Sequence, residues 1–183
     1  MRAFRILLLV TFASLINIGL AELNMHLRLP LFLDSIGTAA GAALLGPTWG
    51  VLIALLTQIG IELINGFSWM YAPWVVCSVA TALIVGIAAR RGFFSALHHV
   101  ILVALLVSLA NALLGAIVHV LIYGGFSGHA TDMLVQGFQL ITGRLFWAAL
   151  WARVPINILD KGIAVGIAYG LLLFARNRSR CTG

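Results

Sequence analysis

The stretch LPLFLDSIGTAAGAALLGPTWG, residues 29–50, decides the class of fold. It is almost wholly apolar, yet it contains one carboxylate, Asp34, then a run of small residues and the Gly46–Pro47 pair. A simple membrane anchor needs none of these features, because it only has to be apolar over about 20 residues. The pattern predicts instead a short helix that begins near Asp34, packs through small residues and turns tightly into the next helix.

The composition of the whole chain places this stretch in a membrane protein. Of 183 residues, 62% are hydrophobic and only 9% are charged, and the mean hydropathy is +1.11. A soluble domain carries about 25% charged residues, so we predict a single-domain, all-α integral membrane protein. The net charge of +6 does not indicate a nucleic-acid partner, because the basic residues cluster at the ends of apolar runs, where the positive-inside rule places them.

Apolar runs predict a six-helix bundle. The expected spans are 4–22, 30–45, 48–66, 73–89, 96–123 and 155–175. With six spans, the arginines near the N-terminus, at 90–91 and near the C-terminus all lie on the cytoplasmic side of a cell membrane, as the positive-inside rule requires. If the polar run 131–153 also crossed the membrane, the arginines near the C-terminus would lie outside. We therefore expect this run to form an outer helical hairpin or an interfacial helix.

The N-terminal segment also has an alternative interpretation. Residues 1–22 combine a basic start, an apolar core and small residues around Gly19 to Ala21, which is also the pattern of a cleaved signal peptide. Asn17 interrupts the apolar core, and the rest of the chain is itself apolar. A retained first span is therefore favoured, with cleavage as the alternative.

Polar side chains recur inside three of the expected spans, all toward the outer side. An ionisable group in hydrocarbon costs about 2.5–3.5 kcal/mol on insertion scales, so each one needs a reason. We expect them to surround an outward-facing polar cavity with aromatic walls that binds a small molecule. The alternatives are simple links between helices, snorkelling at the interface and an aromatic belt. The predicted substrate-binding residues are Glu62, Asn65, Trp69, His119, Tyr123, Asn157, Asp160 and Lys161.

A second set of residues suits helix packing. Small residues at four-residue spacing let helices approach closely, within the chain or against a partner. Asp34 suits the start of a helix, where a carboxylate meets the positive end of the helix dipole. The predicted structural residues are Asp34, Gly37, Gly41, Gly46, Pro47, Gly162, Gly166 and Gly170.

Sequence motifs for catalysis are absent from the chain. It has no HExxH motif, no GxSxG motif with a usable partner and no Walker A motif. We therefore predict no catalytic residue, no metal and no cofactor. An intramembrane enzyme, the least favoured hypothesis, would need the region of Glu62 and His119 to be catalytic. Uphill transport would need energy from another subunit or from an ion gradient.

Two stretches resemble a known family. LPLFLDSIGTAAGAALLGPTWGVLIALLTQIG (29–60) is similar to the second and third helices of the substrate-binding S components of energy-coupling factor transporters, and VPINILDKGIAVGIAYGLLLFARNR (154–178) resembles their last helix. The resemblance implies a six-helix protein that captures a vitamin or similar micronutrient outside the cell. It also implies a membrane coupling subunit and two ATPases as partners. A membrane sensor that shares this fold is the alternative function.

Overall fold

The computed structural model describes residues 2–181, with side chains for residues 3–177. The side chains of Arg2, Arg178 and Arg180, which enter the charge argument above, lie outside this described part. The described residues form α-helices and short 3-10 turns, without a strand. The helices are α1 (Arg2–Leu27), α2 (Ile36–Leu45), α3 (Pro47–Ile64), α4 (Val75–Arg90), α5 (Leu97–Leu121), α6 (Asp132–Thr142) and α7 (Leu145–Cys181).

Five helical stretches are long and apolar enough to cross a membrane. They are Ala3–Leu27, Pro47–Ile64, Ala72–Arg90, Leu97–Leu121 and Leu145–Asn177. The described structure is thus all-helical, and its five long apolar helices support a multi-pass membrane protein.

The first difference from the predicted spans concerns residues 30–45. Only α2 is helical there, and its ten residues extend about 15 Å, half of the roughly 30 Å hydrocarbon layer. Residues 30–34 are not helical. Leu33 has a left-handed φ of 54°, and its backbone N–H donates to the Asp160 carboxylate at 2.8 Å. A tertiary contact to α7 therefore replaces the first turn of the expected helix.

The second difference concerns residues 131–175. We expected an outer segment ending at 153 and a separate span from 155. The structure has the short helix α6, a left-handed turn at Gly143 (φ 64°), and then α7, which continues through Pro155. Proline is tolerated inside membrane helices when neighbouring helices satisfy the freed backbone groups. With 37 residues, α7 extends about 55 Å and belongs to both expected segments.

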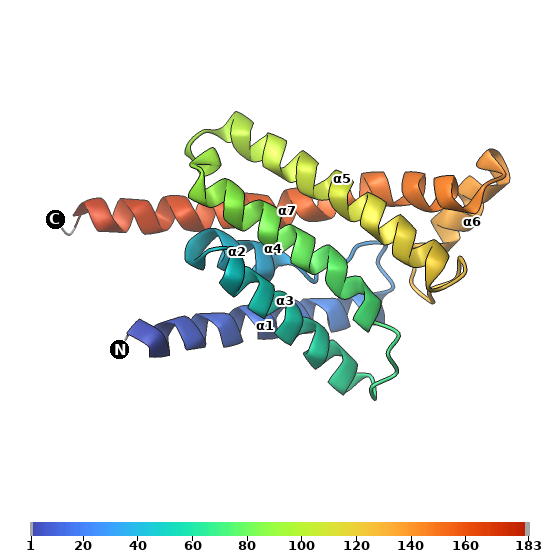
Figure 1. Ribbon diagram of the computed structural model, residues 1–183, viewed down its shortest axis with the longest axis horizontal. Coiled ribbons are helices and arrows are strands. Elements are labelled where there is room, and N and C mark those ends of the chain that lie inside the picture. The colour runs from blue at the N-terminus through green and yellow to red at the C-terminus, as the bar shows by residue number, and fades with distance from the viewer. Residues whose placement is uncertain (1, 182–183) are drawn as a thin grey trace.

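The helices form one elongated bundle with both described ends of the chain at the same end (Figure 1). At the opposite end lie α6 and the first turns of α7, and the segment that joins α1 to α2 lies in the same half of the molecule. The central helix is α2, which packs against α1, α3, α4 and α7. It is rich in alanine and glycine, and its small side chains let these four neighbours come close. Ala39 and Ala42 are fully buried in the main core cluster with Val85 of α4, Val107 of α5 and Ala168 of α7.

The predicted small residues fall into two groups. Gly37 lies against the backbone of Ala13, and Gly41 lies against Ile53. Gly46 separates α2 from α3 with φ of 103°, a conformation that favours glycine. On α7, a Cβ added at Gly162, Gly166 or Gly170 would meet no other described atom within 4 Å, apart from the helix's own backbone. These three glycines do not form a close helix contact within the described chain.

Another close glycine contact joins α4 to the start of α3. A Cβ at Gly86 would lie 2.6 Å from Pro47 Cα, a separation that forces backbone to move. We expect Gly86→Ala to destabilise the protein by about 1–3 kcal/mol through overpacking. Gly166→Ala should be neutral or stabilising, because the space is open and alanine is the better helix former. Thermal unfolding in detergent measures both variants, and equal midpoints would contradict the packing of α3 on α4.

Candidate ligand-binding site

A cavity of about 540 Å³ lies at the end of the bundle away from the chain termini. Its volume is within the range of about 300–1,000 Å³ for small-molecule sites. The five long helices α1, α3, α4, α5 and α7 contribute to its wall, together with α6 and the three segments that join α1 to α2, α3 to α4 and α5 to α6. The segment Arg28–Ser35, named here the crossing segment, contributes Phe32 and Asp34 to the lining.

The crossing segment is held from both sides. Asn24 of α1 donates its side-chain amide to the Leu31 carbonyl at 2.6 Å. On the other side, the Asp160 carboxylate of α7 accepts the N–H groups of Phe32 (3.4 Å) and Leu33 (2.8 Å). Because these contacts replace helical hydrogen bonds, the segment stays extended and covers part of the cavity.

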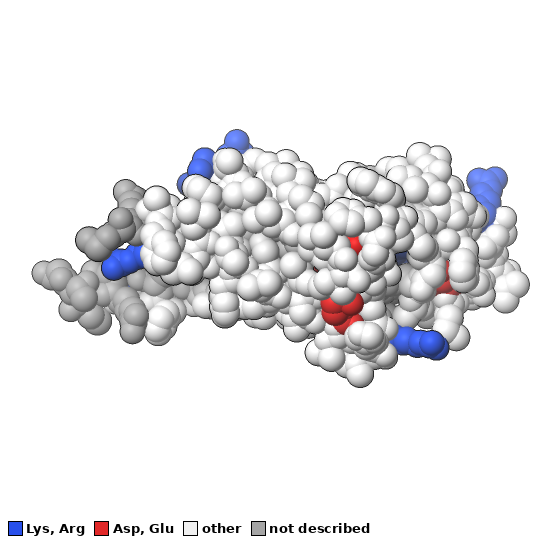
Figure 2. All heavy atoms as spheres, turned by 90° about the horizontal axis from the view of Figure 1, so that it is seen from below, with Lys and Arg blue, Asp and Glu red and all other residues white. Residues whose placement is uncertain are grey.

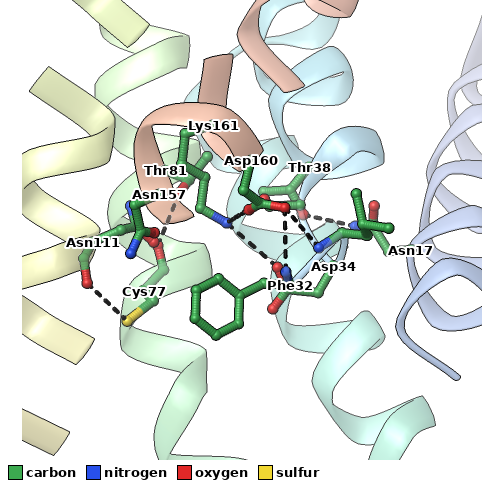
Figure 3. Close-up of polar contacts among 12 residues, drawn as sticks. Asn17, Phe32, Asp34, Thr38, Cys77, Thr81, Asn111, Asn157, Asp160 and Lys161 are labelled. Atoms are coloured by element: carbon green, nitrogen blue, oxygen red, sulfur yellow. Dashed lines mark hydrogen bonds and ion pairs between the residues drawn. The ribbon is translucent and has the colours of Figure 1, made fainter. Parts of the chain in front are cut away.

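Lys161 anchors this arrangement with a buried ammonium group. Its Nζ lies 2.7 Å from Asp160 Oδ2 and 3.5 Å from Asp34 Oδ1, and it donates to Ser35 Oγ at 2.7 Å. Figure 3 shows Lys161 and Asp160 reaching from α7 toward Phe32 and Asp34. Two carboxylates and one hydroxyl therefore satisfy a charge that would otherwise be very costly to bury.

Arg153 is the second buried cation of the cavity lining, and only 1% of it is exposed. Its Cζ lies 4.7 Å from the centre of the Trp74 ring and 5.8 Å from that of Phe32, in cation–π contact with both. Gly115 of α5 lies beside its aliphatic stem. Two aromatic rings and a helix backbone thus fix the position of the guanidinium.

His119 and Asp132 lie behind Arg153. Nη2 of Arg153 is 3.0 Å from His119 Nδ1. A guanidinium only donates hydrogen bonds, so Nδ1 is the acceptor and the neutral imidazole carries its proton on Nε2. Asp132 Oδ1 is 3.8 Å from Nδ1. Asp132 also accepts the N–H groups of Ser127 and Gly128, at 2.9 and 2.8 Å, which fixes the loop at the mouth of the cavity.

Of the eight predicted substrate-binding residues, Asn157 and Lys161 line the cavity. Asn157 is 2% exposed, and its side-chain amide donates to the Arg153 carbonyl at 2.9 Å. Asp160 and His119 contact the lining cations Lys161 and Arg153 from behind. These four residues come together in the structure around the same cavity.

The other four predicted residues lie in or around the loop after α3. The buried Glu62 carboxylate accepts the N–H groups of Trp69, Tyr71 and Ala72, at 2.9, 2.7 and 2.6 Å. Asn65 donates to Glu22 of α1 at 2.8 Å, and Trp69 is 71% exposed. Tyr123 stacks on Trp74, with ring centres 5.3 Å apart, and its hydroxyl donates to the Met70 carbonyl. They organise the loop that carries Trp74.

Sequence reasoning did not select Arg153, Phe32 or His129 as site residues. The signal for Arg153 was present, because residues 153, 157 and 161 have the i, i+4, i+8 spacing of one helix face. Ending the outer segment at 153 and starting a new span at 155 divided that face. Phe32 and His129 stack with ring centres 5.3 Å apart, a contact between two loops that no local pattern predicts.

Metal binding has no geometric support in the described residues, which contain no group of three or more His, Cys, Asp or Glu side chains placed to hold an ion. In comparisons with known proteins, no family model, no curated protein and no solved structure matches this chain.

His129 gives the cavity mouth a pH dependence. It lies in the loop between α5 and α6, outside the spanning helices. Burial, followed by the positive charge of Arg153, lowers the pKa of His129 below its usual value of 6.5. Asp34, Asp132 and Asp160 act in the opposite direction but do not overcome these effects. His129 is therefore neutral at pH 7 and stacks on Phe32 in that form.

We expect acidification to destabilise this stack. The pKa of His129 is lower in the folded protein than in the unfolded chain, so the unfolded chain binds the proton first and stability falls as the pH drops below about 6.5. His129→Phe keeps an aromatic ring but cannot be protonated. Its free energy of unfolding should therefore fall less than that of the wild type between pH 7.5 and 5, with a difference of up to about 1.4 kcal/mol per pH unit. Thermal unfolding measures this as a smaller fall of the midpoint. Parallel pH profiles would contradict this role.

Proposed function

We propose that this protein is the substrate-binding component of a membrane transporter, of the energy-coupling factor type, which captures a vitamin or similar micronutrient at the outer face of a cell membrane. The observation that carries the proposal is the cavity of about 540 Å³ at one end of the bundle. Aromatic walls with a few fixed polar and charged groups are typical of small-molecule binding sites.

The charge distribution supports an outward-facing cavity. Figure 2 shows basic residues at both ends of the molecule, a largely uncharged middle and the visible acidic residues in the half away from the termini. Arg90 ends α4 and Arg91 follows it, toward the end of the bundle that holds both termini. The positive-inside rule favours this end as the cytoplasmic one. The opposite end, with the cavity, then faces outward.

The proposed topology has six passes. The crossing segment and α2 together would make the second pass, since non-helical backbone is tolerated at membrane depth where protein buries it. An even number of passes places both termini on one side of the membrane, and the positive-inside rule makes that side the cytoplasm. α6 would lie at the outer surface, where its exposed side chains Met133, Leu140 and Ile141 could contact the headgroup boundary.

The energy source is proposed to be separate. The sequence has no phosphate-binding Walker A motif, so a binding protein of this kind would depend on a membrane coupling subunit and ATPases for uphill transport.

Isolation of the protein from its native membranes in mild detergent tests this function. We expect a coupling subunit and ATPases to co-purify, and we expect cell-associated substrate uptake to stop when those ATPases are removed. Gly86→Ala, which acts on the fold, serves as a control for loss through instability. Uptake that is unaffected by loss of the ATPases would contradict the proposal, and a co-purifying kinase or cyclase would favour a sensor instead.

A further inference from the structure

Arg153 carries a buried positive charge that no carboxylate of the described chain contacts directly. In the part of the chain that the structure describes, its one side-chain hydrogen bond is to the neutral His119, and its Nε has no acceptor although the atom is buried. Among the described residues, no carboxylate oxygen lies within 4 Å of its guanidinium nitrogens. Buried charges in proteins are normally paired, so this site is incomplete without an anion.

The neighbouring acids are already engaged. Asp34 and Asp160 both contact Lys161, and Asp160 also accepts two N–H groups of the crossing segment. Asp132 accepts the N–H groups of the loop at the cavity mouth. None of the three can turn toward Arg153 without losing these bonds. Their negative charges also repel a ligand with several anionic groups, so a ligand with a single anionic group is favoured.

The surroundings of Arg153 favour a flat ligand. Trp74 and Phe32 fix the guanidinium by contact with its carbon, and both rings also line the cavity, as does Tyr71. Because Trp74 already stacks on Tyr123 and Phe32 on His129, a planar ligand would pack against the edges of these rings and against Tyr71. A guanidinium holds a carboxylate through paired N–H donors. Arginine is suited to this task because its fork of donors matches carboxylate geometry.

A second buried polar atom of the lining without a partner, Asn111 Oδ1, favours a ligand that also carries a hydrogen-bond donor. Asn111 is 2% exposed and lines the cavity. Its amide nitrogen donates to Thr81 Oγ1 and to the Val107 carbonyl. Its Oδ1 is buried without a donor. A ligand N–H or O–H group would satisfy it, since a buried acceptor without a hydrogen bond is costly.

We infer that the cavity binds a small, flat ring compound with a single carboxylate, which pairs with Arg153, and an N–H or O–H group, which donates to Asn111. This inference rests on the proposed function and specifies the chemical class of its substrate. Asn157 and Lys161 would border the ligand, and the crossing segment would cover it.

Three probes with the same ring test the charge requirement. Indole-3-carboxylate, indole-3-carboxamide and indol-3-ylmethylammonium share a flat ring and an N–H donor and differ in charge. Binding of each to the purified protein in detergent is measured at pH 7.5 by calorimetry and thermal shift. We expect the carboxylate to bind at least tenfold more tightly than the amide, and the ammonium compound to bind most weakly.

Variants at Arg153 test its role. Arg153→Gln should remove the preference for the carboxylate, and Arg153→Lys, which keeps the charge but loses the fork, should retain part of it. Arg144→Gln, an exposed arginine near the start of α7, is the matched control and should bind like the wild type. Thermal midpoints measured without a probe identify any variant that fails to fold. If Arg153→Gln fails to fold, Arg153→Lys is used for the test instead.

Mass spectrometry of small molecules extracted from the purified wild type and the Arg153→Gln variant gives an independent readout. A retained carboxylate that is lost from the variant supports the inference. A neutral or cationic retained molecule, or a carboxylate preference that survives Arg153→Gln, overturns the inference and leaves the proposed function intact. If the wild type binds none of the probes and retains no molecule, both the inference and the proposed function fail.

Discussion

The buried contact of Lys161 with Asp160 and Asp34 is the constraint on which the outer half of the molecule depends. Within a membrane helix an ammonium group must find a counter-charge in the protein, and here it lies 2.7 and 3.5 Å from two carboxylates. Asp160 also accepts backbone N–H groups of the crossing segment. One cluster therefore ties α7 to the segment before α2, shortens that helix to ten residues and leaves a cavity under the segment.

The two cations of the cavity lining illustrate the difference between a structural and a functional charge. Lys161 has its partners within the chain, so its charge is satisfied in the described structure. Arg153, eight residues earlier on the same helix face, has aromatic rings and a neutral imidazole around it but no described carboxylate within 4 Å. A cation that is fixed by packing and lacks a counter-charge is preorganised for a ligand, because little side-chain freedom remains to be lost on binding.

Hydropathy and composition were sufficient to predict the all-helical membrane class, because nearly every span is longer and more apolar than a soluble helix. The details of the site depended on contacts between distant residues. Glu62 has the helical spacing expected of a cavity residue, yet its carboxylate turns to three N–H groups of the following loop. Pro155 suggests a helix start, yet α7 passes through it. Loop conformation and a proline tolerated by its neighbours are tertiary effects that periodicity does not contain.

The most direct test of a cavity built for an anion is an experimental structure of the wild-type protein, purified from its own membranes without added ligand. We predict flat density beside Trp74 and Phe32, with a carboxylate within hydrogen-bonding distance of the Arg153 guanidinium and the crossing segment closed over it. A cavity occupied only by water, or a bound molecule that leaves Arg153 without an anionic partner, would contradict this prediction.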